Sequence, residues 1–143
     1  MNKTCVIYGG TEETQLVSSR WKTQINENSK SKAFIGSMPE VHHNEILSWQ
    51  ADIKGSMNNF ILIFLRSPFE HPQISKRFEL TEELLNDKVQ ILNIFTKESK
   101  NNLKILMELV LLGDLLSISL AKNLKMEPED IDTIEELKKL LEG

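Results

Sequence analysis

The stretch Phe60-Ile61-Leu62-Ile63-Phe64-Leu65 is apolar at every position. A strand with one solvated face alternates apolar and polar residues. A short run without alternation is typical of a central strand in a parallel sheet that is covered on both faces. This stretch therefore predicts a buried strand and, with it, an α/β fold.

Three further segments predict strands around this one, at residues 5–8, 33–35 and 89–95. Helical patterns separate the strands, over residues 11–28, 40–49, 74–86, 103–124 and 131–141. Alternation of this kind predicts a three-layer α/β/α sandwich with a mostly parallel sheet and a flavodoxin-like topology. Residues 54–59 are predicted to be a loop.

Two of the predicted helices carry further expectations about burial. Met107 and the leucines around it recur at helical spacing, which predicts that they belong to the core. In the last helix, Glu135-Glu136 is followed by Lys138-Lys139, which predicts a solvent-facing surface with ion pairs one turn apart.

Composition limits the classes of protein that the chain can belong to. The 143 residues, of which 40% are hydrophobic and 27% charged, fit one globular domain and exclude disorder as the main state. A net charge of −4 argues against binding to nucleic acid, which needs a basic face. The single Cys5 excludes an internal disulfide, and only three histidines accompany it, so no metal site is expected. No segment reads as a membrane span or targeting signal, and we expect a cytoplasmic protein.

The turn Gly9-Gly10-Thr11 follows the first predicted strand. Its amides lie at a helix N-terminus beyond the carboxyl end of a strand, which is where open parallel sheets hold phosphates and other anions. However, the turn matches neither the Walker A nor the GxGxxG pattern. A tight turn that needs glycine is therefore the favoured interpretation, with an anion site as the alternative.

Hydrogen-bonding side chains crowd the stretch Arg20-Trp21-Lys22-Thr23-Gln24-Ile25-Asn26-Glu27-Asn28-Ser29-Lys30 near a helix end. An ordinary amphipathic helix has more apolar positions than this. A carboxylate at such an end, here Glu27, faces the negative pole of the helix dipole, which favours proton uptake and suits a general base. Nearby lysines oppose this effect, and a solvated helix end is the alternative interpretation.

Two adjacent histidines, His42 and His43, follow a loop that contains Pro39. They point in different directions on a helix and are therefore not a chelating pair, but either could shuttle a proton near neutral pH. The residues alone favour a surface histidine at a helix start, with a proton shuttle as the alternative. His71 stands beside Pro72 and is predicted to be a capping or surface residue.

Beyond these patterns, the sequence closely resembles the bifunctional phosphoglucose/phosphomannose isomerase family, and in particular its C-terminal sugar-isomerase (SIS) domain. The block from Arg20 to Lys30 carries the resemblance, followed by Ala33-Phe34 and by Pro39-Glu40-x-x-His43-Asn44-Glu45-Ile46. Later matches are Leu65-Arg66, Leu112-Gly113-Asp114 with Ser117 and Leu120-Ala121, and Pro128 before Ile134-x-x-Leu137-Lys138. The resemblance covers essentially the whole chain.

The resemblance implies an aldose–ketose isomerase that interconverts glucose 6-phosphate or mannose 6-phosphate with fructose 6-phosphate through a cis-enediolate. It implies that Glu27 is the catalytic base and that His43 helps to open the sugar ring across a dimer interface. Lys138 is the best match for the lysine that assists ring opening, with Lys139 and Lys122 as alternatives. Such chemistry needs no cofactor and no metal.

The chain departs from the family in length, because members have two SIS domains in tandem and are about twice as long. We expect residues 1–143 to be the C-terminal SIS domain alone, without the N-terminal domain that supplies the phosphate-binding loop. Gly10 and Thr11 are at best a distant counterpart of that loop, and Asn28 is a further candidate for substrate binding. His42 stands where the family has asparagine.

These observations predict partners and limits. The expected partners are a phosphosugar substrate, an N-terminal SIS domain and a second copy in a homodimer, and the isolated chain should have little or no activity. One alternative is a non-catalytic SIS module that binds a phosphosugar or a regulatory partner. Another is a generic flavodoxin-like domain that binds flavin.

Overall fold

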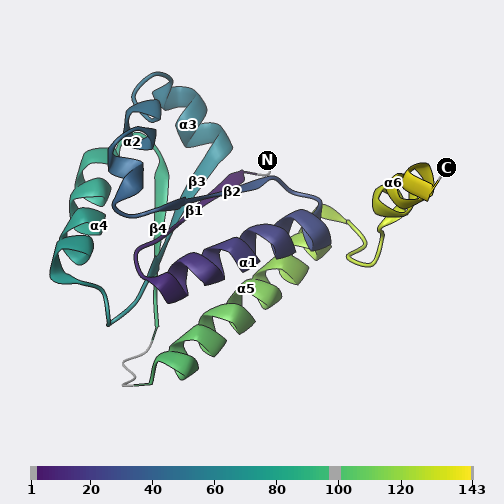
Figure 1. Cartoon of the computed structure of the whole chain (residues 1–143). Helices are drawn as coiled ribbons and strands as arrows, with labels where there is room; N and C mark the ends of the chain where they lie inside the picture. Colours follow the sequence, from purple (N-terminus) through teal and green to yellow (C-terminus); the bar gives the residue numbers. More distant parts are fainter. Residues whose placement is uncertain (1–2, 97–100, 143) are drawn as a thin grey trace.

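The computed structural model describes residues 3–96 and 101–142, and its strands and helices alternate along the chain (Figure 1). The strands are β1 (Thr4–Gly9), β2 (Ala33–Ser37), β3 (Phe60–Arg66) and β4 (Gln90–Phe95). The helices are α1 (Glu12–Ser29), the 3-10 helix η1 (Glu40–His42), α2 (Glu45–Ser48), α3 (Ile53–Asn59), α4 (Pro72–Leu85), α5 (Asn102–Leu124) and α6 (Asp132–Glu142).

The four strands form one parallel sheet in the order β2-β1-β3-β4. The register places Ile7 of β1 between Ile35 of β2 and Ile63 of β3. The chain moves from β1 to one side for β2 and then returns to the other side for β3, as in the flavodoxin-like order. The predicted parallel sheet and its topology are confirmed.

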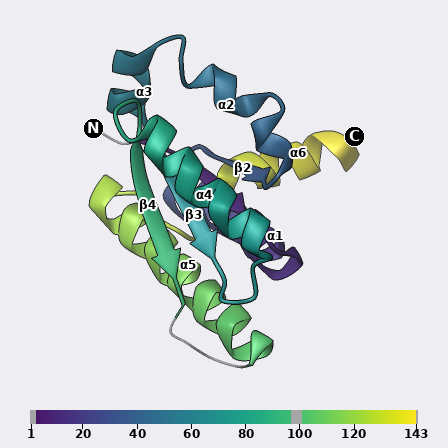
Figure 2. The same cartoon turned by 90° about the vertical axis from the view of Figure 1, so that its left-hand side faces the viewer.

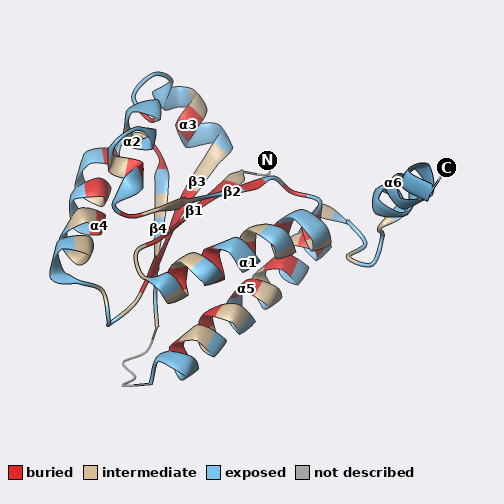
Figure 3. Cartoon of the chain, in the orientation of Figure 1, coloured by how far each residue is buried: buried red, intermediate tan, exposed pale blue. Residues whose placement is uncertain are grey.

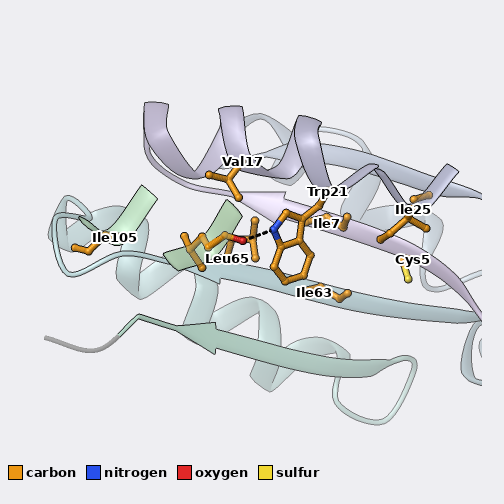
Figure 4. Packing of buried hydrophobic residues seen from close by; sticks show 10 residues of the cluster. Cys5, Ile7, Val17, Trp21, Ile25, Ile63, Leu65 and Ile105 are labelled. Carbon is orange, nitrogen blue, oxygen red and sulfur yellow. Dashed lines mark hydrogen bonds between the residues drawn. The ribbon is translucent and has the colours of Figure 1, made fainter. Parts of the chain in front are cut away.

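Helices cover the sheet on both faces (Figures 1 and 2). On one face α1 and α5 lie side by side over the sheet, and Trp21 of α1 is the largest side chain buried there. Its indole Nε1–H donates a hydrogen bond of 2.8 Å to the backbone oxygen of Leu109 in α5 (Figure 4). Trp21 thus packs against the sheet and also fixes one helix to the other.

The opposite face is covered by α4, by η1 and by Trp49 at the end of α2, and aromatic side chains make up much of its core. Tyr8 stacks on Phe64 with 6.0 Å between ring centroids, and Phe64 contacts Phe78 of α4 at 5.0 Å. Burial raises the pKa of Tyr8 to about 12, and Trp49 donates to its hydroxyl at 3.4 Å. Because both faces are covered, the three-layer sandwich is confirmed and β3 is buried on either side, as its sequence predicts.

Two local predictions were wrong. Residues 54–59 belong to helix α3 and are not a loop, because the side chain of Asp52 caps that helix by accepting the amide of Gly55 at 2.8 Å. Residues 40–49 do not form one helix. The non-helical backbone of Asn44 divides η1 from α2, and its side chain caps α2 by accepting the amide of Glu45 at 2.6 Å.

The prediction that Met107 lies in the core was also wrong, since 55% of it is exposed. Helix α5 buries the face that carries Ile105, Leu109 and Gly113, and a Cβ on Gly113 would overlap the indole of Trp21. Nothing in the described chain covers the opposite face. That face exposes a line of apolar side chains: Leu103, Met107, Leu111, Leu115 and Ile118.

Helix α6 lies apart from the layers and has no buried residue (Figure 3). Its apolar side chains are exposed, from 45% at Ile134 to 78% at Leu141. The solvent-facing helix is confirmed, but the ion pairs predicted within it are absent from its described residues. In residues 3–96 and 101–142, no helix is long and apolar enough to cross a membrane.

Candidate functional site

A groove of about 580 Å³ opens at the C-terminal end of α1, where Glu27 is exposed on the last turn. One wall comes from α1 and the other from the segment that leads into α6. The residues that line it are mostly polar: Lys22, Thr23, Asn26, Glu27, Lys30, Asp130, Ile131, Asp132, Thr133 and Ile134. Carboxylates and ammonium groups therefore meet there, from parts of the chain about a hundred residues apart.

Lys30 joins the two walls of the groove. It ends α1 in the left-handed conformation, with φ of 55°. Its Nζ donates to the backbone oxygen of Glu27 at 2.7 Å and to that of Pro128 at 3.3 Å. The second bond fixes the connection after α5 against the end of α1, and this contact brings residues 130–134 beside Glu27.

The side chain of Asn28 is engaged in hydrogen bonds within α1 and to α5. Its Nδ2 donates to Gln24 at 3.1 Å and to the hydroxyl of Ser117 in α5 at 2.8 Å, and Ser117 donates in turn to the backbone oxygen of Asp114. Asn28 is absent from the lining of the groove. These hydrogen bonds hold the last turn of α1 on α5.

His43 lies far from the groove within one chain. It follows η1 beyond the carboxyl end of β2 and is exposed. Helix α1 runs antiparallel to the strands, so Glu27 lies near their amino ends (Figure 1). The structure places the two residues at opposite ends of the sheet and does not bring them together. A site that contains both needs His43 from a second copy.

The candidate lysines are more dispersed. Lys138 is exposed on α6, one turn after Ile134 of the groove wall, and Lys139 is its exposed neighbour. Lys122 belongs to the last turn of α5. Of these, Lys138 and Lys139 share an element with the groove lining, because α6 begins there.

The turn at Gly10 and Thr11 uses its own amides internally. Both backbone N–H groups donate to Oγ1 of Thr14 at 2.9 Å, and the side chain of Thr11 accepts the amide of Thr14. A Cβ on Gly9 would meet the backbone of Thr14 at 2.6 Å, which explains that glycine by close packing. An anion bound here would have to displace Thr14.

Sequence reasoning missed a buried ion pair at the carboxyl end of β3. The side chains of Arg66 and Glu70 are 6% and 4% exposed, and their charged atoms approach to 2.8 Å. The guanidinium also donates to Ser75 and lies 4.7 Å from the ring centroid of Phe78 and 5.1 Å from that of Phe95. This pair fixes the loop that precedes α4. The sequence gives no sign of this pair, because an arginine and a glutamate four positions apart after a strand are common and need not be buried together.

Among residues 3–96 and 101–142, no group of three or more histidine, cysteine, aspartate or glutamate side chains is placed so that it could hold a metal ion. The capping role predicted for His71 is confirmed, since its ring accepts the amide of Gln73 at 3.2 Å at the start of α4.

The sheet order and the two helical layers define the class of the protein as a parallel α/β sandwich with helices on both faces of the sheet. Glucosamine-6-phosphate deaminase from Thermotoga maritima has a similar fold, with a TM-score of 0.62 over 89% of this chain and 38% of that chain. Only 13% of residues are identical, so the likeness concerns the fold.

Residues 1–141 match the family described as the bacterial phospho-glucose isomerase C-terminal SIS domain, and the chain belongs to that family. It is 33% identical over 137 residues to a bifunctional phosphoglucose/phosphomannose isomerase from Aquifex aeolicus, covering 95% of this chain and 42% of the relative. A protein of the same name from Caldicellulosiruptor bescii is 31% identical, over 98% of this chain and 41% of the relative. A D-glucosamine-6-phosphate 4-epimerase from Sulfolobus acidocaldarius is 29% identical, over 85% and 35%.

The predicted family membership is thereby confirmed. The chain spans about two fifths of the length of the curated relatives that it matches.

Proposed function

We propose that the chain is the C-terminal domain of an isomerase that interconverts glucose 6-phosphate and mannose 6-phosphate with fructose 6-phosphate, with Glu27 as its base. The observation that carries the proposal is the position of Glu27. In a chain of this family, it stands exposed on the wall of a groove that mostly polar residues line and where two distant segments meet.

The proposed reaction begins with ring opening, in which His43 and Lys138 exchange protons with the ring oxygen and the C1 hydroxyl. The Glu27 carboxylate then removes the proton from C2 of the open aldose. The electrons of that C–H bond form the C1–C2 double bond, and the aldehyde oxygen takes up the negative charge of a cis-enediolate. Transfer of the hydroxyl proton from O2 to O1 and return of the Glu27 proton to C1 yield the ketose.

The groove has some, but not all, of the features that this reaction needs. A carbon acid is deprotonated efficiently by a base that is excluded from bulk water, but Glu27 is exposed in the isolated chain. Lys22 and Lys30 bring positive charge to the groove, while Asp130 and Asp132 offset it. A second domain must therefore close the groove and supply the main phosphate contacts.

The proposed partners follow from this incompleteness: a phosphosugar, an N-terminal SIS domain and a second copy that supplies His43. The exposed apolar side chains of α5 and α6 offer surface for the contacts with the N-terminal domain and with the second copy. The buried free thiol of Cys5 suits the reducing cytoplasm in which we place the enzyme.

The test compares the chain alone with the same chain fused behind the preceding part of the Aquifex aeolicus relative. We expect fructose 6-phosphate from glucose 6-phosphate at roughly 1–10³ per second from the fused protein and no measurable turnover from the chain alone. Turnover of roughly 10 per second or more by the chain alone would overturn the proposed incompleteness. A fused protein that binds the sugar phosphate without converting it would favour a non-catalytic module.

A further inference from the structure

His42, which directly precedes the candidate site residue His43, makes two side-chain hydrogen bonds to α4. Its Nε2 lies 2.7 Å from Oγ1 of Thr81, and its Nδ1 lies 3.0 Å from Nη1 of Arg77. The ring is half-buried, whereas the neighbouring His43 is exposed. Among the described residues, no other side-chain hydrogen bond joins η1 or α2 to α4.

These two contacts determine the protonation of the ring. The hydroxyl of Thr81 donates its proton to the backbone oxygen of Arg77 at 2.7 Å, so its oxygen accepts from His42. The guanidinium of Arg77 can only donate, so Nδ1 of His42 must accept. The ring is therefore neutral and carries its proton on Nε2.

The electrostatic surroundings favour the same state. Burial lowers the pKa of His42, and the charge of Arg77 on α4 and the adjacent His43 lower it further. A proton added to Nδ1 would face the Arg77 guanidinium and would remove the acceptor of its hydrogen bond. The neutral ring is thus a condition for both contacts.

We propose that His42 is a positioning residue, which clamps the turn that bears His43 onto α4 through Thr81 and Arg77. The inference rests on the proposed role of His43 in ring opening. The turn needs such an anchor because α2, which follows it, has no buried residue. On one side of His43, Val41 is buried, and the next buried side chain after it is Trp49. Because the clamp fixes His42, it also fixes the backbone from which the His43 side chain projects.

The clamp is tested by NMR on this chain, with 15N-labelled histidine rings and backbone amides. We expect His42 to show a protonated Nε2 and an unprotonated Nδ1 at pH 7.5. In His42→Ala, the order parameter of the His43 amide should fall from about 0.85 to below about 0.6. His42→Gln should keep it high, because the amide oxygen and nitrogen of glutamine are spaced like the two ring nitrogens and can serve Arg77 and Thr81.

A pH titration separates positioning from simple packing. As the pH falls through the lowered pKa of His42, the clamp should open and the order of the His43 amide should decrease, whereas His42→Gln should show no such step. His71 serves as the internal control, because its ring bonds to the amide of Gln73, away from the clamp.

The proposal is overturned if Nδ1 of His42 is protonated at pH 7.5, or if the order of His43 is the same in the wild type, His42→Ala and His42→Gln. Should His42→Ala fail to fold, the tautomer and the pH step of the wild type still decide the question. None of these measurements involves turnover. If the NMR results show no clamp but His43 is still required for isomerisation in the fused protein, only this inference is refuted. An intact clamp with His43→Ala fully active in the fused protein refutes the proposed function alone.

Discussion

Glu27→Gln in the fused two-domain protein is expected to lower kcat for glucose 6-phosphate by about 10²- to 10⁴-fold, which is the range for loss of a positioned general base. Glutamine retains the size and hydrogen-bonding shape of glutamate but cannot accept the proton from C2. Because Glu27 lies on the surface of α1 and makes no side-chain hydrogen bond within the described chain, the fold should be unaffected. Steady-state kinetics in both directions measure the effect.

The matched control is Glu83→Gln, which removes an exposed carboxylate from α4. It should leave kcat unchanged within experimental error. If Glu27→Gln retains more than about a tenth of the kcat, the base must be another group, because the expected loss for a general base is at least tenfold larger.

Trp21→Ala is expected to reduce the free energy of unfolding of this chain by about 3–5 kcal/mol. The side chain is 1% exposed, and its loss leaves a cavity between α1, α5 and the sheet. It also removes the hydrogen bond to Leu109 and the contact that Gly113 is shaped to accept. Since domains of this size have a free energy of unfolding of about 5–15 kcal/mol, the loss removes a large share of the stability and raises the fraction of unfolded molecules. Urea denaturation followed by circular dichroism measures the change.

Leu16→Ala is the control on the same helix, because Leu16 is 68% exposed. Its effect should stay within about 0.5 kcal/mol in the isolated chain. Equal effects of the two substitutions would contradict the packing described for the face formed by α1 and α5.

The central part of the fold could be predicted because its signals are local. The uninterrupted apolar run of β3 can be satisfied only by cover on two faces, and the structure provides it through Trp21 on one side and Phe78 on the other. Helix α3 was missed because it is only seven residues long, carries just two apolar side chains, Ile53 and Met57, and depends on one cap at Asp52. A cap in a short polar segment is equally compatible with a turn.

Helix α5 shows a second limit. It is apolar on several faces. The spacing of its apolar residues does not indicate which face packs against α1 and which stays uncovered in this chain. The small residues Gly113, Ser117 and Ala121 mark the buried face, because they allow α1 to approach closely. Met107 lies on the uncovered face, where only a further domain or copy can bury it.

The sequence names candidate site residues but does not indicate where they lie in space. Glu27 and His43 were identified by resemblance, and their separation to opposite ends of the sheet follows from the direction of α1 against the strands. The contacts of His42 span 35 and 39 positions in the sequence, and no local pattern indicates them.

The central claim is that one complete site combines Glu27 of one copy with His43 of another, and subunit mixing tests it most directly. In the fused protein, Glu27→Gln and His43→Ala are each expected to be nearly inactive as homodimers. After denaturation and refolding of an equal mixture, half of the dimers are mixed, and each mixed dimer contains one site with both residues intact. Recovery of about one quarter of the wild-type activity is the predicted result for a two-fold symmetric dimer with shared sites. A mixture no more active than the separate variants, with mixed dimers demonstrated by mass spectrometry, would contradict the account.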